Sequence, residues 1–156
     1  MNHEDFMRSA VALSREKMHE SAGGPFAALV VLDGEVVGEG WNHVTSCNDP
    51  TAHAEISAIR DACQRLSTFS LESAVIYTSC EPCPMCLAAI YWARISRFYY
   101  ANTTADAAAI GFDDATIYEQ IRLPAEKRTV PSKHLYLEEA RAVFAEWEAM
   151  PGKIAY

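Results

Sequence analysis

The sequence lacks several features that would place it at once among membrane, secreted or multidomain proteins. None of its apolar runs approaches the roughly 20 residues needed to cross a bilayer. Its first residues, MNHEDFMRSA, carry acids where a signal peptide has a basic and then an apolar region. Repeats, low-complexity tracts and flexible linkers are missing as well. We therefore expect a cytoplasmic protein without membrane association, forming a single domain over residues 1–156.

Basic residues are also scarce. Lysine and arginine together number 13 against 21 acidic residues, which gives a formal net charge of −8. The basic residues form no cluster, whereas a protein that binds nucleic acid needs a basic surface to neutralise phosphates. The composition therefore argues against a nucleic-acid partner and favours a small, uncharged substrate.

What the sequence does contain is a regular alternation of helical and strand patterns. Strands are expected over 26–32, 35–42, 74–79, 97–101 and 134–137. Helices are expected over 4–20, 50–66, 84–93, from about 102 to 121, and over 138–149. Alternation of this kind is typical of a sheet that is parallel in part and covered by helices on both faces. An early hairpin at Asp33-Gly34 makes the sheet mixed, so we predict a three-layer α/β/α domain.

Three of the five cysteines fall within the short segment SCEPCPMC, residues 79–86. Cys80 closes a strand, whereas Cys83 and Cys86 flank Pro84 at the start of a helix. The positive end of the helix dipole at that point favours thiolates, the form that binds a metal. Two thiols at this spacing could equally form a redox pair, so the segment PTAHAE (50–55) decides between these interpretations.

In that segment, His53 and Glu55 occupy the opening turns of another predicted helix. Two helix N-termini facing one zinc ion would supply the imidazole of His53 and the thiolates of Cys83 and Cys86. Three protein ligands leave one position for water, which is typical of a catalytic rather than a structural zinc site. A bound water would yield hydroxide near neutral pH, with Glu55 as the proton shuttle. We therefore expect one Zn²⁺ per chain and a hydrolytic reaction.

The pairing of HAE with PCPMC resembles the cytidine-deaminase superfamily of zinc deaminases. Longer segments are similar to those of bacterial guanine deaminases: GGPFAA, NDPTAHAEISAIR, YTSCEPCPMCLAAIYWAR, GFDDATIY, PAEKRTVP and a C-terminal tyrosine. This resemblance implies a five-stranded mixed sheet and a homodimer whose C-terminal segment can be exchanged between subunits. It also implies hydrolysis of guanine to xanthine and ammonia by a zinc-bound hydroxide, in the service of purine catabolism.

The same resemblance assigns substrate contacts. Asn42 matches the asparagine that binds the purine, and its amide offers both a donor and an acceptor. Asp114 matches the acid that accepts hydrogen bonds from the N1–H and 2-amino groups of guanine, while the backbone N–H of Ala54 reaches the ring or its oxygen. The aromatic residues implied around the base are Phe26, Trp92 and Tyr156.

Three other functions are compatible with parts of this pattern. A guanosine deaminase would share most of the motifs and differ in leaving room for ribose. A tRNA adenosine deaminase would share the zinc ligands but needs a basic surface. A structural zinc or thiol-redox module would have no use for Glu55 beside an open coordination position. Of the neighbouring residues, Asp113 is expected to cap a helix, and Cys80 is expected to have a structural role.

Overall fold

The computed structural model describes residues 1–156. Contacts within the chain divide it into two compact units, Met1–Thr116 and Ile117–Tyr156. None of the helices combines the length and the apolar character that a membrane span requires.

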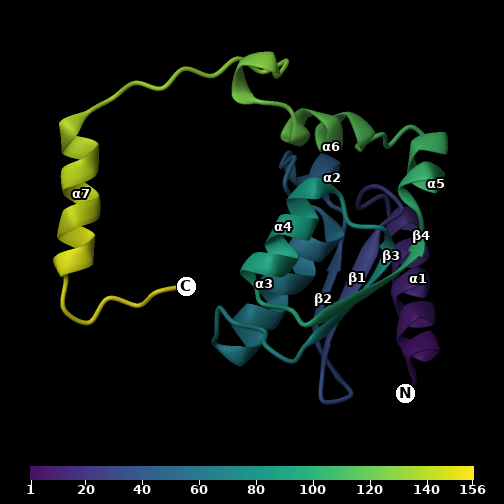
Figure 1. Ribbon diagram of the computed structural model, residues 1–156. Coiled ribbons are helices and arrows are strands. Elements are labelled where there is room, and N and C mark those ends of the chain that lie inside the picture. Colours follow the sequence, from purple (N-terminus) through teal and green to yellow (C-terminus); the bar gives the residue numbers. More distant parts are fainter. The chain divides into compact units, whose positions relative to one another are not determined.

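The first unit is built on one mixed sheet (Figure 1). Its strands are β1 (Ala27–Leu32), β2 (Glu35–Trp41), β3 (Val75–Cys80) and β4 (Arg97–Asn102), in the order β2-β1-β3-β4. β1 runs antiparallel to both β2 and β3, whereas β3 and β4 are parallel. β4 is therefore an edge strand.

The predicted fifth strand is wrong, because the sheet has four strands. Residues 134–137 follow an extended path but join no ladder, and they belong to the second unit. Their alternating side chains suit a strand, but a strand also needs a hydrogen-bonded neighbour.

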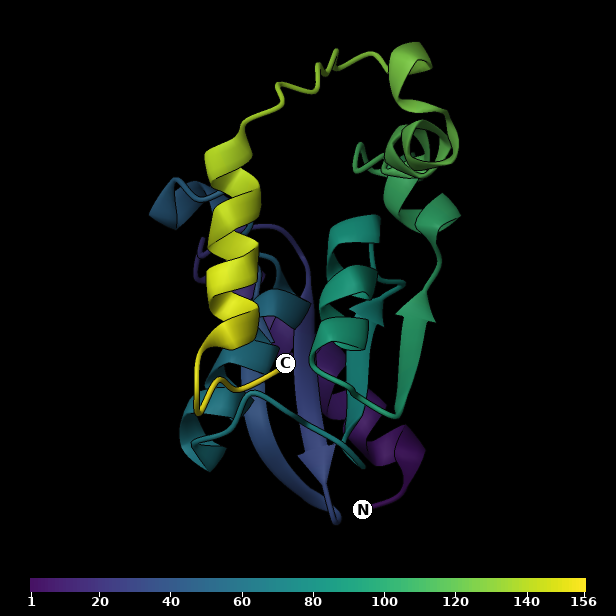
Figure 2. The same cartoon turned by 60° about the vertical axis from the view of Figure 1, so that its left-hand side comes forward.

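Helices cover both faces of the sheet, as expected for an α/β fold in three layers (Figures 1 and 2). α1 (His3–His19) lies on one face, where its Phe6 and Ala10 pack against Leu29 and Val31 of β1. Alternate residues of a strand point to opposite faces, so Ala28 and the other inward positions meet the helices of the second face.

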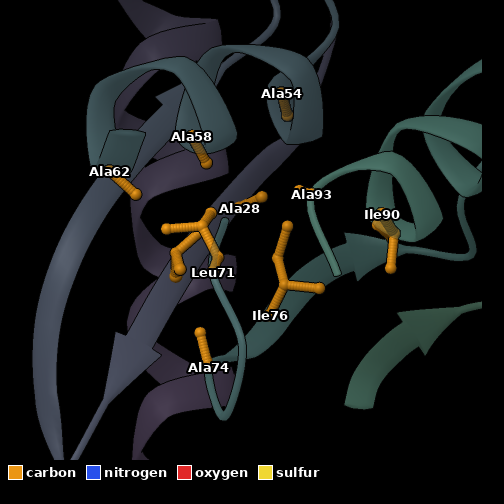
Figure 3. Close-up of a cluster of buried hydrophobic side chains, with 10 residues drawn as sticks. Ala28, Ala54, Ala58, Ala62, Leu71, Ala74, Ile76, Ile90 and Ala93 are labelled. Carbon is orange, nitrogen blue, oxygen red and sulfur yellow. The ribbon is translucent and has the colours of Figure 1, made fainter. Parts of the chain in front are cut away.

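That second face carries α3 (Ala54–Leu66) and α4 (Pro84–Trp92). Its core cluster joins Ala58 of α3 and Ile90 of α4 to Ile76 of β3 (Figure 3). α3 lies very close to β2: a Cβ on Gly40 would come within 2.2 Å of the carbonyl oxygen of Ala54. Only glycine permits this approach, which holds the first turn of α3 against the end of the sheet.

Apart from shifts of one residue, helix boundaries differ from the sequence prediction in two places. The helix expected from Pro50 begins at Ala54, because the Asp49 carboxylate accepts hydrogen bonds from the N–H (2.8 Å) and hydroxyl (2.7 Å) of Thr51 and forms a turn instead. A short helix, α2 (Val44–Cys47), precedes that turn. The helix expected from about 102 to 121 is divided into α5 (Thr104–Ala109) and α6 (Ala115–Arg122).

The second unit contains a 3₁₀ turn, η1 (Ala125–Lys127), and a helix, α7 (Glu138–Ala149). The helix occupies the predicted range of 138–149. No residue of α7 is buried, although Phe144 and Trp147 are large and apolar.

Candidate active site

Two helix N-termini bring the predicted metal ligands together. His53 is the N-cap of α3, and Cys83 is the N-cap of α4. The Nδ1 atom of His53 lies 3.5 Å from the sulfur of Cys83 and 3.6 Å from that of Cys86. The three ligand atoms all lie within 4.8 Å of one another. Neither N-cap side chain caps its own helix, so both remain directed toward the shared position.

The chemistry of these donors fits zinc. A hydrogen bond with Cys86 and a second one with His53 together lower the pKa of the Cys83 thiol to about 4, although burial opposes this shift. The same contact with Cys83, together with burial, raises the pKa of Cys86. The Cys83 thiol therefore ionises more readily than that of Cys86, and a bound cation would favour the thiolate form of both. One imidazole and two thiolates form a ligand set of the kind that zinc accepts.

Cys80 stands apart from this group. Its thiol points to the carbonyl oxygen of Thr103, with the sulfur 3.6 Å from that oxygen. Burial raises the pKa of Cys80 to about 11, so this thiol stays protonated where Cys83 ionises. The contrast supports the structural role expected for Cys80.

Glu55 lies in the first turn of α3 and is 7% exposed. Burial raises the pKa of its carboxyl group, which lets the side chain hold a proton more readily than an exposed glutamate does. The buried hydroxyl of Thr78 lies 3.4 Å from Oε1 of Glu55 and donates more closely, at 2.7 Å, to the carbonyl oxygen of Cys80. A buried acid of this kind is suited to proton transfer.

His53, Cys83 and Glu55 line a cavity of about 670 Å³ formed entirely within the first unit. Phe26 and Phe112 meet edge to face in its wall, with ring centroids 4.9 Å apart. Asn42, Asp114 and Glu81 supply polar groups to the lining. A largely apolar cleft with a few convergent polar groups is typical of a small-molecule site.

The side chain of Asn42 has a defined orientation. Its Oδ1 accepts hydrogen bonds from the backbone N–H groups of Gly24 (3.1 Å) and Val44 (3.3 Å). Gly23 permits this fold-back, since a Cβ there would lie 2.6 Å from the same oxygen. We expected the amide to offer a donor and an acceptor, but its oxygen is already used. Asn42 therefore presents N–H donors alone to a ligand.

Both acids of GFDD line the cavity, but they differ in hydrogen bonding and burial. Asp113 accepts a hydrogen bond from the N–H of Ala115 at the start of α6 (3.0 Å), as expected of a helix cap. Asp114 is half-buried in the cavity lining, and burial raises its pKa. Ala54 also lines the cavity, and its N–H belongs to the first turn of α3, where helix N–H groups have no partner within the helix.

Two predicted substrate residues do not line this cavity. Trp92 lies at the C-terminal end of α4, whereas the metal ligands occupy the N-terminal end of that helix. Trp92 therefore does not line this cavity, and its expected contact with the base stays a prediction. Tyr156 ends the second unit, so its contact with the base stays a prediction.

The lining residues that the sequence analysis did not single out include Phe112 and Glu81. Both lie inside motifs already quoted, Phe112 in GFDD and Glu81 in SCEPCPMC. Phe112 stands two residues before Asp114, and Glu81 stands two residues before Cys83, so proximity in sequence was the available signal for both.

A His-Cys-Cys ligand group beside a buried glutamate that is not itself a ligand, set on an α/β/α sheet, defines the zinc-dependent deaminases of bases and nucleosides. The chain belongs to this family, because the model for the cytidine and deoxycytidylate deaminase zinc-binding region matches residues 1–102.

Within this family, the chain is similar to several individual proteins. Guanine deaminase of Bacillus subtilis is 50% identical over 156 residues, covering 100% of both chains. The solved structure of guanine deaminase from that organism superimposes with a TM-score of 0.97 over 100% of this chain and 99% of that one. A structure of guanine deaminase from Nitrosomonas europaea is 33% identical, with a TM-score of 0.69 over 72% of this chain and 65% of that one. A tRNA-specific adenosine deaminase of Aquifex aeolicus is 30% identical over 147 residues, 94% of each chain.

Proposed function

We propose that this protein catalyses the hydrolytic deamination of guanine, converting guanine and water to xanthine and ammonia. The observation that carries the chemistry is the buried carboxyl group of Glu55 in one cavity with His53 and Cys83, whose ligand atoms converge with that of Cys86. The choice of guanine is supported by full-length similarity to guanine deaminase at 50% identity.

His53, Cys83 and Cys86 would hold zinc, and zinc when bound would supply the Lewis acidity that lowers the pKa of a water molecule. Glu55 does the proton transfer. Its carboxylate accepts a proton as the water oxygen attacks C2 of guanine, and it delivers that proton to a ring nitrogen. A second proton from the added hydroxyl passes through Glu55 to the amino group, which leaves as ammonia.

The remaining polar groups orient the base. The carboxylate of Asp114 accepts hydrogen bonds from N1–H and the 2-amino group, which together distinguish guanine from adenine. The N–H donors of Asn42 and the N–H of Ala54 meet acceptor atoms of the purine. Phe26 provides an apolar surface for the ring plane, which places C2 near the metal-binding group.

A substrate panel tests this function. The zinc-loaded protein is assayed for ammonia release from guanine, guanosine, adenine, cytosine and cytidine. Guanine is expected to have the highest kcat/KM. Faster ammonia release from guanosine would show that the protein is a nucleoside deaminase. Faster ammonia release from adenine or cytosine would overturn the role of Asp114. A tRNA substrate is disfavoured by the net charge of −8.

We further propose that the protein is a homodimer of single deaminase domains that exchange the segment 117–156. Support comes from α7, which buries no residue. Its apolar residues Val143, Phe144 and Trp147 are 59%, 78% and 45% exposed. An amphipathic helix normally buries its apolar side. Light scattering is expected to give the mass of two chains, and Phe144→Asp is expected to give a monomer. Val11→Asp, at an exposed position of α1, is the matched control.

We also propose a cytoplasmic location. All five cysteines are free thiols, and the metal site needs two of them reduced. A reducing compartment maintains thiols in that state.

A further inference from the structure

Glu81 connects the metal-binding segment to the end of the neighbouring strand. Its backbone N–H donates to the carbonyl oxygen of Asn102 (2.8 Å). Its carboxylate Oε2 accepts a hydrogen bond from the N–H of Thr104 (3.1 Å), the first residue of α5. The first N–H groups of a helix have no partner within the helix, and the carboxylate of Glu81 supplies one from another part of the chain.

On one side of this connection lies the metal-binding group. Glu81 precedes the ligand Cys83 by two residues, and Pro82 between them is fully buried. A buried proline has little conformational freedom. The position of the Glu81 carboxylate is therefore closely tied to that of Cys83.

On the other side lies the loop that faces the base. Ala107 of α5 is 8% exposed and lines the cavity, and its carbonyl oxygen accepts a hydrogen bond from the N–H of Phe112 (3.0 Å). Phe112 and Asp114 then complete that part of the lining. A shift at the start of α5 would consequently move both Phe112 and Asp114, the residue proposed to hydrogen-bond the base.

The sheet gives this region support from one side alone. β4 is an edge strand paired with β3, so no further strand holds the chain where it leaves β4 for α5. The bonds from Glu81 to Asn102 and Thr104 supply anchorage that an interior strand would receive from a second neighbour.

We propose that Glu81 is a positioning residue for guanine recognition. Its carboxylate accepts a hydrogen bond from the Thr104 N–H and so holds α5 in place. Phe112 and Asp114 thereby keep their positions relative to the metal-binding group. Glu81 takes no part in the proton transfers. This inference rests on the proposed role of Asp114 in binding guanine.

Steady-state kinetics of the zinc-loaded enzyme test the proposal. In Glu81→Ala the KM for guanine is expected to rise about tenfold, as for the loss of a hydrogen bond to a charged group, with kcat changed far less. Zinc content should stay at one per chain. Glu81→Gln keeps a carbonyl oxygen for the Thr104 N–H and is expected to restore KM to within about threefold of the wild type. A Glu81→Gln enzyme as impaired as Glu81→Ala would overturn the proposal.

A matched control removes an equivalent bond elsewhere. Asp61 Oδ2 accepts a hydrogen bond from the N–H of Glu39 (2.9 Å), and neither residue lines the cavity. Asp61→Ala should leave the KM for guanine unchanged. The double variant Glu81→Ala/Asp114→Ala should be little worse than Asp114→Ala, because Glu81 acts through that loop. Independent, multiplying effects would instead mean direct contact with the base, against the proposal.

Hydrogen exchange separates this inference from the proposed function. In Glu81→Ala, amides of residues 104–112 should exchange faster while those of α4 keep their protection. That result does not depend on guanine, so it would still show that Glu81 anchors α5 even if Asp114→Ala had no effect and the role of Asp114 in guanine recognition failed. Unchanged exchange over 104–112 would refute the positioning role whatever the kinetics.

Discussion

The Nδ1 atom of His53 lies 3.5 Å from the sulfur of Cys83, although 30 residues separate them in the chain. Each residue is the N-cap of its helix, so two helix N-termini meet at one point. Their dipoles stabilise negative charge there, which favours thiolates in a site that must bind a cation.

The first prediction concerns the metal. The purified protein should hold one zinc per chain by elemental analysis, and His53→Ala, Cys83→Ala or Cys86→Ala should each remove it. Chelation should abolish deamination, and added zinc should restore it. Cys80→Ala is the matched control and should retain the metal, because that thiol contacts Thr103 instead. Loss of zinc from Cys80→Ala with retention in Cys83→Ala would show that the ligand set is misassigned.

Glu55→Gln should separate proton transfer from metal binding. The amide is nearly isosteric but cannot shuttle protons, so kcat should fall by about 10²–10⁴-fold while zinc content is unchanged. Because burial raises the pKa of Glu55 and disfavours its charged form, neutral glutamine should not lower the melting temperature. Near-normal turnover by this variant would defeat the mechanism.

Asp114→Asn tests base reading. The change leaves one acceptor oxygen where the carboxylate has two, so kcat/KM for guanine should drop about tenfold or more. Asp113→Asn is the adjacent control, since an amide oxygen can still accept from the Ala115 N–H. Equal losses in the two variants would argue for disturbance of α6 instead of base recognition.

Asn42→Asp tests the orientation of the amide. One carboxylate oxygen can keep the bonds from Gly24 and Val44, so the fold should survive. The other oxygen then faces a purine acceptor where an N–H stood, and kcat/KM for guanine should fall about 10²-fold. Asn48→Asp, at an exposed position, should behave as the wild type. Full activity in Asn42→Asp would mean that the base does not accept from this residue.

Deletion of Tyr156 tests the C-terminal segment. Zinc content and melting temperature should hardly change, while guanine turnover should weaken about tenfold or more if the tyrosine closes the cavity. Mixing the deletion variant with Glu55→Gln should partly restore activity if the segment crosses between subunits. An intact kcat/KM in the truncated enzyme would rule out the closing role.

Local sequence determined most of the helices and strands of this protein and the residue types at its site. Helix α7, the hairpin at Asp33-Gly34 and the proline-initiated α4 follow from spacing, turn residues and capping preferences that operate within a few residues of chain. The same local rules indicated a zinc centre, because His53, Glu55, Cys83 and Cys86 stand at helix starts.

Tertiary structure decided what those residues can reach. Residues 134–137 have the pattern of a strand but no partner in the sheet, and Trp92 lies in the predicted helix but away from the cavity. The oxygen of Asn42 is taken by backbone donors from two separate segments, which no local pattern records. Strand pairing, the site that a side chain faces and the saturation of a hydrogen-bond acceptor all depend on distances between remote parts of the chain. Helix and turn formation depend on near neighbours in the sequence.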